Sequence, residues 1–268
     1  MFDYHVHTSF SADSHMPMKA ACNAAVGKGI EEIAFTEHLD IIYPDSNLKW
    51  DFDYEEYNKE VRHLKKTFKN RLTIVRGVEV GLHPSGYDAA SAFIDRGGFD
   101  FVIGSVHVVD DKDLHEGAFF QKRTLNQAIY DYFCCLNQQV KDFDNFNVLG
   151  HLDLVKRYLK YLNCSTAEVR WQDYFPVIED TLKALIESGR GIEVNMSGYR
   201  YGLGCSLPGR DVIKLYYDLG GEIITVGSDA HYEECVGLSI DKGVSLLKEI
   251  GFKYVTTFKE RKPIFNRI

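Results

Sequence analysis

The feature that most constrains the fold of this chain is a regular alternation of short apolar runs with longer amphipathic segments. The short runs are rich in Val, Ile and Phe, which is typical of buried parallel strands. The expected strands are Phe2–His7, Glu32–His38, Thr73–Val80, Phe99–His107, Asn147–His151, Gly191–Met196 and Glu222–Asp229, and Lys253–Thr257 is a candidate for a short eighth strand. A strand followed each time by a helix predicts repeated parallel β/α units.

The segments between the strands have the hydrophobic period of helices. The expected helices are Met18–Lys28, Tyr54–Asn70, Tyr87–Arg96, Thr124–Phe143, Asp173–Ser188, Gly209–Leu219 and Glu233–Glu249. Gly29, Gly97 and Gly189 follow three of them, as is common at helix C-termini. The sequence shows no linker, internal repeat or low-complexity tract, so we expect one domain over residues 1–268.

Two α/β architectures share this alternation, an open doubly wound sheet and a closed barrel. The open sheet usually carries a glycine-rich phosphate loop after its first strand. Here the first strand runs into the segment HVHTSFSADSH, which has no glycine and is rich in histidine. A TIM-like barrel is therefore favoured, with functional side chains at the C-terminal ends of its strands.

The composition of the chain limits the kinds of partner that the protein is expected to bind. Lys and Arg number 31 and Asp and Glu 39, a formal net charge of −8, so we expect no nucleic-acid partner. No apolar run approaches the roughly 20 residues that cross a bilayer, so no membrane partner is expected. The six cysteines form no CxxC pair and the N-terminus shows no signal segment, which predicts a cytoplasmic protein. Cys134 and Cys135 lie in an amphipathic segment and are expected to be small core residues.

Residues of the types that commonly bind metals lie at the ends of six of the seven expected strands. They are His5, His7, His38, Glu79, His107, His151, Asp229 and His231. All strands of a parallel barrel point the same way, so these ends converge on one rim. Imidazole suits zinc, iron and manganese, and carboxylates bridge ions and offset their charge. A single histidine such as His63, in mid-helix, is more often structural, but eight groups together predict a site for more than one ion.

The same residues form six ordered motifs. They are His5-Val-His7, Thr36-Glu37-His38, Gly77-Val78-Glu79, Gly104-Ser105-Val106-His107, Gly150-His151-Leu152-Asp153 and Gly227-Ser228-Asp229-Ala230-His231. This pattern resembles the PHP family, named for polymerase and histidinol phosphatase, over the whole chain. The resemblance implies a distorted (β/α)7 TIM-like barrel that binds three divalent metal ions, drawn from zinc, manganese and iron.

The resemblance also implies how the ligands are shared among the three ions. The ligands of the first would be His5, His7, Glu79 and Asp229. Glu79 would bridge to a second ion, which His107 and His151 also hold. The third would be bound by His38 and His231.

One more ligand of the third ion is expected a few residues after the first motif. Many members of the family have histidine there, at the position that is Asp13 in this chain. His15 lies two residues later and is the alternative, so both remain candidates and Asp13 is favoured. An aspartate would make the site more tolerant of manganese or iron.

Chain length, the opening motif and the segment GHLDLVKRY are most similar to the histidinol-phosphatase branch of the family. That branch hydrolyses L-histidinol phosphate to L-histidinol and phosphate in histidine biosynthesis. The alternative is a phosphatase or phosphodiesterase that acts on nucleotides or other small phosphate esters. An amidohydrolase is disfavoured, because those barrels bridge two ions with a lysine on strand four, where this chain has His107. A non-catalytic metal-binding protein is disfavoured because every family metal position carries a ligand residue.

The expected mechanism uses a metal-bound hydroxide, because divalent ions lower the pKa of bound water towards about 7. Glu79, Asp229 and His231 are the expected catalytic residues. Glu79 bridges two ions, and Asp229 or a neighbouring histidine supplies a proton to the leaving oxygen.

The substrate-binding residues are expected on the same rim. Arg157 and Arg200 are the candidates for a fork on the phosphate, whereas Arg210 and Lys156 are weaker ones. An aromatic wall against an imidazole ring is the remaining expectation. Its candidates are Phe10, Tyr43, Tyr158, Tyr199 and Tyr201.

Overall fold

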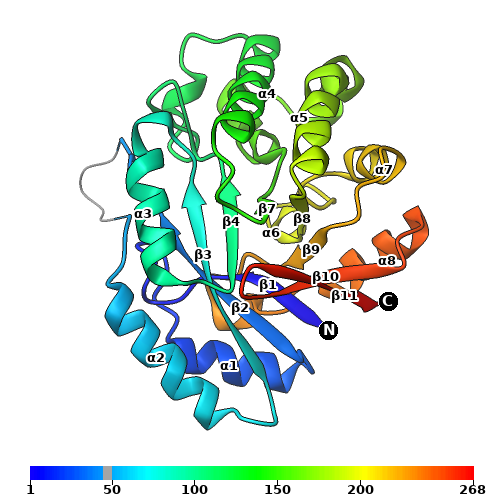
Figure 1. Ribbon diagram of the computed structural model, residues 1–268. Helices are drawn as coiled ribbons and strands as arrows, with labels where there is room; N and C mark the ends of the chain where they lie inside the picture. Colours follow the sequence, from blue (N-terminus) through cyan, green and yellow to red (C-terminus); the bar gives the residue numbers. More distant parts are fainter. Residues whose placement is uncertain (45–49) are drawn as a thin grey trace.

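A seven-stranded parallel sheet forms the centre of the molecule. The computed structural model describes residues 1–44 and 50–268. The strands are β1 (Phe2–Val6), β2 (Glu32–Leu39), β3 (Thr73–Gly81), β4 (Phe101–Ser105), β7 (Val148–Leu149), β8 (Gly191–Asn195) and β9 (Ile224–Gly227). They lie side by side in that order, so each new parallel strand is added next to the previous one (Figure 1). All seven expected strands are therefore present, with β4, β7 and β9 clearly shorter than expected.

The first and last strands nearly close the sheet into a barrel. A single parallel bridge joins Val6 to Ala230. Next to it, the His7 amide donates to the Ala230 carbonyl at 2.9 Å, and the Asp229 amide donates to the His5 carbonyl at 2.8 Å. The structure is thus a distorted (β/α)7 barrel, as expected, and its seam lies where the first and last motifs meet.

A buried carboxylate fastens this seam. Asp3, on β1, is fully buried, and its two oxygens accept from the Ser228 amide at 2.8 Å, the Ser228 hydroxyl at 2.6 Å and the Gly237 amide at 2.7 Å. Because β1 and β9 share so few backbone hydrogen bonds, this carboxylate holds the loop that follows β9.

Asp3→Ala is expected to lower the free energy of unfolding by about 3 kcal/mol, because it leaves buried donors without an acceptor. Urea unfolding of the metal-free protein, followed by circular dichroism, measures the change. Asp88→Ala is the matched control on the exposed first turn of a helix, where the loss should stay below about 1 kcal/mol. Equal stability of the two variants would contradict the seam role of Asp3.

Helices cover the outside of the barrel (Figure 1). They are α1 (Met18–Gly27), α2 (Tyr54–Thr67), α3 (Tyr87–Gly97), α4 (Leu125–Asp142), α5 (Phe175–Glu187), α7 (Arg210–Asp218) and α8 (Ile240–Ile250). The short α6 (Ser197–Arg200) follows β8 directly and lies at the rim. The longest, α4, starts with a capping box of Thr124 and Gln127 and buries Ile129, Phe133 and Leu136 against the core. Cys134 and Cys135, expected as core residues, are both only half-buried, and of the two Cys135 packs against the core.

Two expected elements differ from the structure near the C-terminus. The expected helix 233–249 is instead a short 3-10 helix, η6 (Glu233–Cys235), followed by α8, because Gly237 and Ser239 have φ of 70° and 62° and break the helix. The candidate eighth strand becomes β10 (Tyr254–Lys259), which pairs antiparallel with β11 (Lys262–Arg267) in a separate two-stranded sheet. Glu260 and Arg261, both with positive φ, form the tight turn between them.

The connections around the rim contain short elements that the sequence pattern did not predict. The 3-10 helices are η1 (Pro84–Gly86), η2 (Ala118–Phe120), η3 (Leu154–Leu162), η4 (Thr166–Glu168) and η5 (Trp171–Tyr174). The expected helix 173–188 is divided between η5 and α5. A small hairpin, β5 (Val108–Val109) and β6 (Lys112–Asp113), follows β4. In the described part of the chain, no helix has the length and apolar character needed to cross a membrane.

Candidate metal centre

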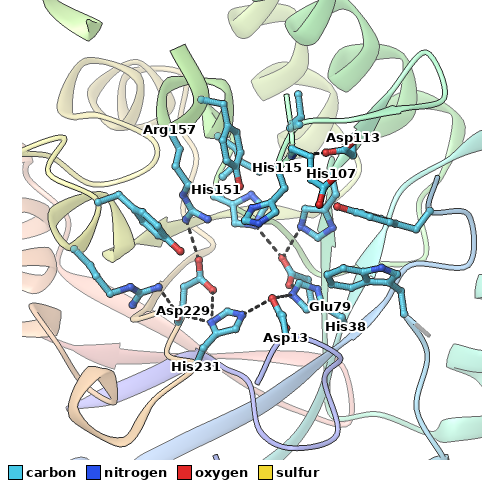
Figure 2. A pocket seen from close by; sticks show the side chains of 18 of the residues that line it. Asp13, His38, Glu79, His107, Asp113, His115, His151, Arg157, Asp229 and His231 are labelled. Carbon is cyan, nitrogen blue, oxygen red and sulfur yellow. Dashed lines mark hydrogen bonds and ion pairs between the residues drawn. The ribbon is translucent and has the colours of Figure 1, made fainter. Parts of the chain in front are cut away.

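The eight strand-end residues and Asp13 come together at the C-terminal rim of the barrel, and Figure 2 shows Asp13 with six of the eight, all but His5 and His7. His5, His38 and Glu79 lie within β1, β2 and β3, and the others stand one to four residues beyond their strands. Asp13 reaches the rim from the loop after β1. The convergence predicted from parallel strands is therefore observed. It brings together residues as far apart in the sequence as His5 and His231.

Glu79 lies at the centre of this group and is fully buried. Five imidazole nitrogens lie within 3.4 Å of its carboxylate. On the Oε2 side they are those of His5, His7 and His38, at 3.2, 3.4 and 3.0 Å. On the Oε1 side they are those of His107 and His151, at 3.4 and 2.9 Å. One carboxylate thus faces two sets of imidazoles, which is the arrangement that a bridging ligand needs.

Asp13 occupies the outer edge of the group. Its Oδ2 lies 3.0 Å from His231 Nε2 and 3.5 Å from His38 Nε2. His15 is exposed on the same loop and is not among the residues that line the pocket. The geometry thus favours Asp13 over His15, in agreement with the preference drawn from the sequence.

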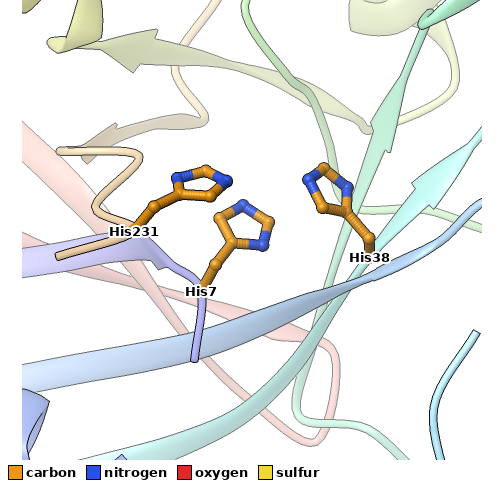
Figure 3. Close-up of side chains that lie close together, drawn as sticks. All are labelled: His7, His38 and His231. Atoms are coloured by element: carbon orange, nitrogen blue, oxygen red, sulfur yellow. The ribbon is translucent and has the colours of Figure 1, made fainter. Parts of the chain in front are cut away.

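Three sets of ligand atoms are each compact enough for one metal ion, with all atoms of a set within 4.8 Å of one another. One set is His5, His7 and Asp229, which are three of the four residues that the resemblance assigned to the first ion. A second is His38, Glu79 and His107, and a third is His7, His38 and His231 (Figure 3). His7 and His38 each belong to two sets, so the assignment of each ligand to one ion stays a prediction.

The donor set fits divalent metal ions. Three buried atoms of the group, His38 Nδ1, Glu79 Oε2 and His151 Nδ1, make no hydrogen bond within the described chain. Fully buried imidazoles and carboxylates of this number would be costly without a positive ion among them. Nitrogen and carboxylate oxygen are also the ligands preferred by zinc, manganese and iron.

Four imidazoles have an outer hydrogen-bond partner that orients them, and that of His231 is the backbone carbonyl of Asp229, 3.0 Å from its Nδ1. His5 Nδ1 donates to Glu193 Oε1 at 2.6 Å, and His107 Nδ1 donates to Asp40 Oδ1 at 2.8 Å. His7 Nδ1 lies 3.0 Å from the Ser11 hydroxyl. Such contacts fix the ring and leave Nε2 for a metal.

Sequence reasoning missed these outer partners, yet two of them had a signal. Asp40 follows His38 by two residues and so lies on the same side of the chain. Glu193 is an acidic residue in strand β8, which is buried along its whole length. A polar residue in a buried strand indicates a functional contact.

The electrostatics of the group match the exchange of protons for metal ions. Burial works against charge on His5, but the carboxylates of Glu193, Glu79 and Asp229 raise its pKa well above the ordinary value. Burial likewise opposes charge on Glu79, but nearby imidazoles, that of His5 first, hold its pKa well below the usual range. Protons on the imidazoles thus balance the buried carboxylates until metal replaces them.

Zinc affinity is expected to rise steeply with pH, because ligand imidazoles must lose their protons. Burial lowers the pKa of His107, but Asp40 and Glu79 raise it to about 9. Below that pH the proton competes with metal, so affinity should fall by more than tenfold per unit between about pH 8 and pH 6. Competition with a chelator of known pH dependence measures it, and a flat profile would show that the imidazoles bind metal without releasing protons.

A cavity of about 370 Å³ opens above these residues. Arg157, Arg200, Tyr43, Tyr158 and Tyr201 line it, as expected. Two members of the expected aromatic wall do not. They are Phe10, which packs edge-on against Tyr57 in the core, and Tyr199, which lies beside Lys242. The lining residues missed by sequence reasoning include Trp50, Asp113, His115, Glu116 and Tyr232.

The Arg157 side chain is 12% exposed and lies between the cavity and Asp229. Its Nη2 donates to Ser197 Oγ at 2.6 Å and to Asp229 Oδ2 at 3.1 Å, and its guanidinium lies 4.1 Å from the centre of the Tyr201 ring. Arg200 donates to the backbone carbonyls of Ser228, at 3.2 Å, and Asp229, at 2.7 Å. Both arginines thus contact the segment that follows β9.

The two weaker candidates lie outside the residues that line the cavity. Lys156 forms a buried ion pair with Asp153 at 2.5 Å. Arg210 forms an exposed pair with Glu249 at 2.7 Å, at the start of α7. Of the four basic candidates, Arg157 and Arg200 therefore line the cavity, and Lys156 and Arg210 do not.

The chain is similar to curated histidinol-phosphatases over nearly its whole length. It is 32% identical over 261 residues to the histidinol-phosphatase of Lactococcus lactis subsp. lactis, which covers 97% of this chain and 95% of the relative. It is 28% identical to the probable histidinol-phosphatase of Clostridium acetobutylicum, with 95% and 96% covered.

Solved structures with the same fold include phosphatases. The histidinol phosphate phosphatase of Lactococcus lactis subsp. lactis, in complex with zinc, L-histidinol and phosphate, has a TM-score of 0.88 and is 31% identical, with 98% of each chain covered. The putative histidinol phosphatase of Listeria monocytogenes has a TM-score of 0.79 at 18% identity, covers 90% of this chain and 99% of its own, and shows the fold alone.

The family model of the PHP domain matches residues 3–197, well over half of the sequence. That range contains five of the six motifs, and the sixth closes the barrel against β1. The motifs, the seven-stranded barrel and the relatives agree, and the chain belongs to the PHP family.

Proposed function

We propose that this chain is a metal-dependent phosphomonoesterase that hydrolyses L-histidinol phosphate to L-histidinol and phosphate, a step of histidine biosynthesis. The observation that carries the proposal is the complete set of ligand side chains around Glu79. It stands in a fold that matches, over 98% of both chains, a phosphatase solved with zinc, L-histidinol and phosphate.

The proposed cofactors are three divalent ions, of zinc, manganese or iron. The side chains that would hold them are His5, His7, Asp13, His38, Glu79, His107, His151, Asp229 and His231. Bound divalent ions would lower the pKa of a water molecule and neutralise charge on the phosphoryl oxygens. Within this chain, the outer contacts of Glu193 and Asp40 would keep Nε2 of His5 and His107 directed at the ions.

The two cavity arginines would bind the phosphate. Arg157 points from η3 towards the metal centre, and its buried Nε has no hydrogen-bond partner within the described chain (Figure 2). A guanidinium presents paired donors that match phosphate oxygens. Arg200 would hold the Ser228–Asp229 backbone in place and face the same cavity.

The proton for the leaving oxygen would come from a histidine beside Asp229 rather than from Asp229 itself. Burial would raise the pKa of Asp229, but His5, Arg157 and His231 hold it well below its usual range, so Asp229 stays ionised. An ionised Asp229 would accept rather than supply a proton. His231 lies at the mouth of the cavity, with Nδ1 3.6 Å from Asp229 Oδ1 and Nε2 3.0 Å from Asp13 Oδ2.

Phosphate release from L-histidinol phosphate, beside a panel of nucleotide and sugar phosphates, tests the proposal. The protein is reconstituted separately with zinc, manganese and iron. A strong preference for L-histidinol phosphate is expected. Turnover of other esters alone would keep a metal-dependent phosphatase but discard the substrate, and no turnover with any metal would support a non-catalytic metal-binding protein.

A further inference from the structure

Glu37 is a buried carboxylate beneath the metal centre that has no role so far. It belongs to the Thr36-Glu37-His38 motif, and its side chain points away from the ions' ligands towards the loop after β1. Its exposed fraction is 0%. It accepts from the Thr8 amide at 2.9 Å, the Thr8 hydroxyl at 2.6 Å and the Ser11 hydroxyl at 2.7 Å.

Ser11 connects this carboxylate to the imidazole of His7. A hydroxyl has one hydrogen to donate and two lone pairs that accept. Ser11 Oγ donates to Glu37 Oε2 at 2.7 Å and accepts from the His38 amide at 3.1 Å. Its remaining lone pair faces His7 Nδ1 at 3.0 Å. Since the hydroxyl has no second hydrogen, His7 Nδ1 must carry the hydrogen of that bond.

This direction is that of a Glu37 carboxylate whose two oxygens both act as acceptors. Oε2 accepts from the Thr8 amide as well as from Ser11, and Oε1 accepts from the Thr8 hydroxyl. A proton on Oε1 would leave the Ser11 bond unchanged, whereas a proton on Oε2 would reverse it. Thr8 and Glu37 together therefore fix the orientation of the Ser11 hydroxyl.

The direction of this hydrogen bond matters for metal binding, because His7 belongs to two of the three compact sets of ligand atoms. With the hydrogen on Nδ1, His7 Nε2 has a free lone pair that faces Glu79 at 3.4 Å and Asp229 at 3.6 Å. The opposite tautomer would turn an N–H towards the ions and remove a ligand from both sets. His5 and His107 donate from Nδ1 directly to a carboxylate, whereas His7 Nδ1 is connected to the Glu37 carboxylate through the Ser11 hydroxyl.

We propose that Ser11 and Glu37 are positioning residues that hold His7 in the tautomer with Nε2 free for metal. The proposal rests on the metal-dependent function proposed above. The Ser11 hydroxyl also accepts a hydrogen bond from the His38 backbone amide. Ser11 therefore positions two neighbouring ligands, His7 and His38.

The tautomer of His7 in the metal-free protein is the direct test. Long-range proton–nitrogen correlation spectra of protein labelled at histidine distinguish the two tautomers, and His7→Gln identifies the His7 signals by their loss. A hydrogen on Nδ1 is expected. A hydrogen on Nε2 in the wild-type protein would overturn the proposal, and this measurement needs no variant of Ser11 or Glu37.

Zinc affinity of three variants provides the second test, by chelator competition on the metal-free protein. Ser11→Ala is expected to weaken zinc binding about 10- to 100-fold and to mix the tautomers of His7. Ser9→Ala, the same change at an exposed position of the same loop, should leave both unchanged. Glu37→Gln should stay close to wild type, because its amide oxygen can replace Oε2 and its amide group can donate to the Thr8 hydroxyl.

The opposite results have distinct meanings. Unchanged zinc affinity and tautomer in a folded Ser11→Ala protein would refute the positioning role. Neither readout uses a phosphate ester, so failure to hydrolyse L-histidinol phosphate would refute the proposed function and leave this inference standing.

Discussion

Glu79→Gln is expected to reduce phosphate release from L-histidinol phosphate by at least about 10³-fold. The carboxylate oxygens lie within 3.4 Å of five imidazole nitrogens, so the substitution replaces the one group shared by both sides of the centre with a neutral amide. A neutral amide bridges divalent ions poorly and leaves their charge less balanced. The bound metal per chain should also fall, which elemental analysis of the reconstituted protein measures.

Glu56→Gln is the matched control for this change. Glu56 is exposed on α2, where it pairs with Lys59, and it should leave activity and metal content at the wild-type level. The circular dichroism of Glu79→Gln should resemble that of the wild-type protein, because the barrel core is built from apolar strand residues. Undiminished phosphate release with a full metal complement would show that the bridging role belongs to another residue.

The barrel and most of the candidate centre could be predicted from the sequence because both depend on local periodicity. Apolar strands that end in a histidine or an acid are visible as patterns, and parallel strands bring their ends together whatever the loops do. Glu79 and His107 could therefore be placed on one rim although the chain between them carries a helix. The distance between strand ends did not need to be known.

The arrangement of ligands within the rim could not be predicted, because it depends on loops without periodicity. His231 approaches His7, with ring centres 4.3 Å apart, through the turn after β9 in which Asp229 has a φ of 55°. Asp13 reaches His231 only because the loop after β1 folds back over the rim. Likewise η3, which carries Arg157, had a pattern that gave no sign of a 3-10 helix.

Arg157→Met is expected to lower kcat/KM for L-histidinol phosphate by about 10²- to 10³-fold, the scale of losing a charged donor to a developing oxyanion. Arg157→Lys should recover only part of this loss, because an ammonium cannot reproduce the paired donors of the guanidinium. Inhibition by inorganic phosphate shows whether Arg157 binds the phosphate or only holds neighbouring side chains in place. It should weaken in both variants if Arg157 contacts the phosphate, whereas it should persist if the guanidinium only holds Asp229 and Ser197.

Arg210→Met provides the matched control, because Arg210 lies outside the cavity in an exposed ion pair with Glu249 and such pairs contribute little. Its kcat/KM and its inhibition by phosphate should stay within about twofold of wild type. Metal content should be unchanged in all three variants, since a guanidinium has no lone pair with which to bind a metal ion. If Arg157→Met loses metal along with activity, its contact with Asp229 is the part that matters, and the phosphate must be bound by Arg200 and the ions instead.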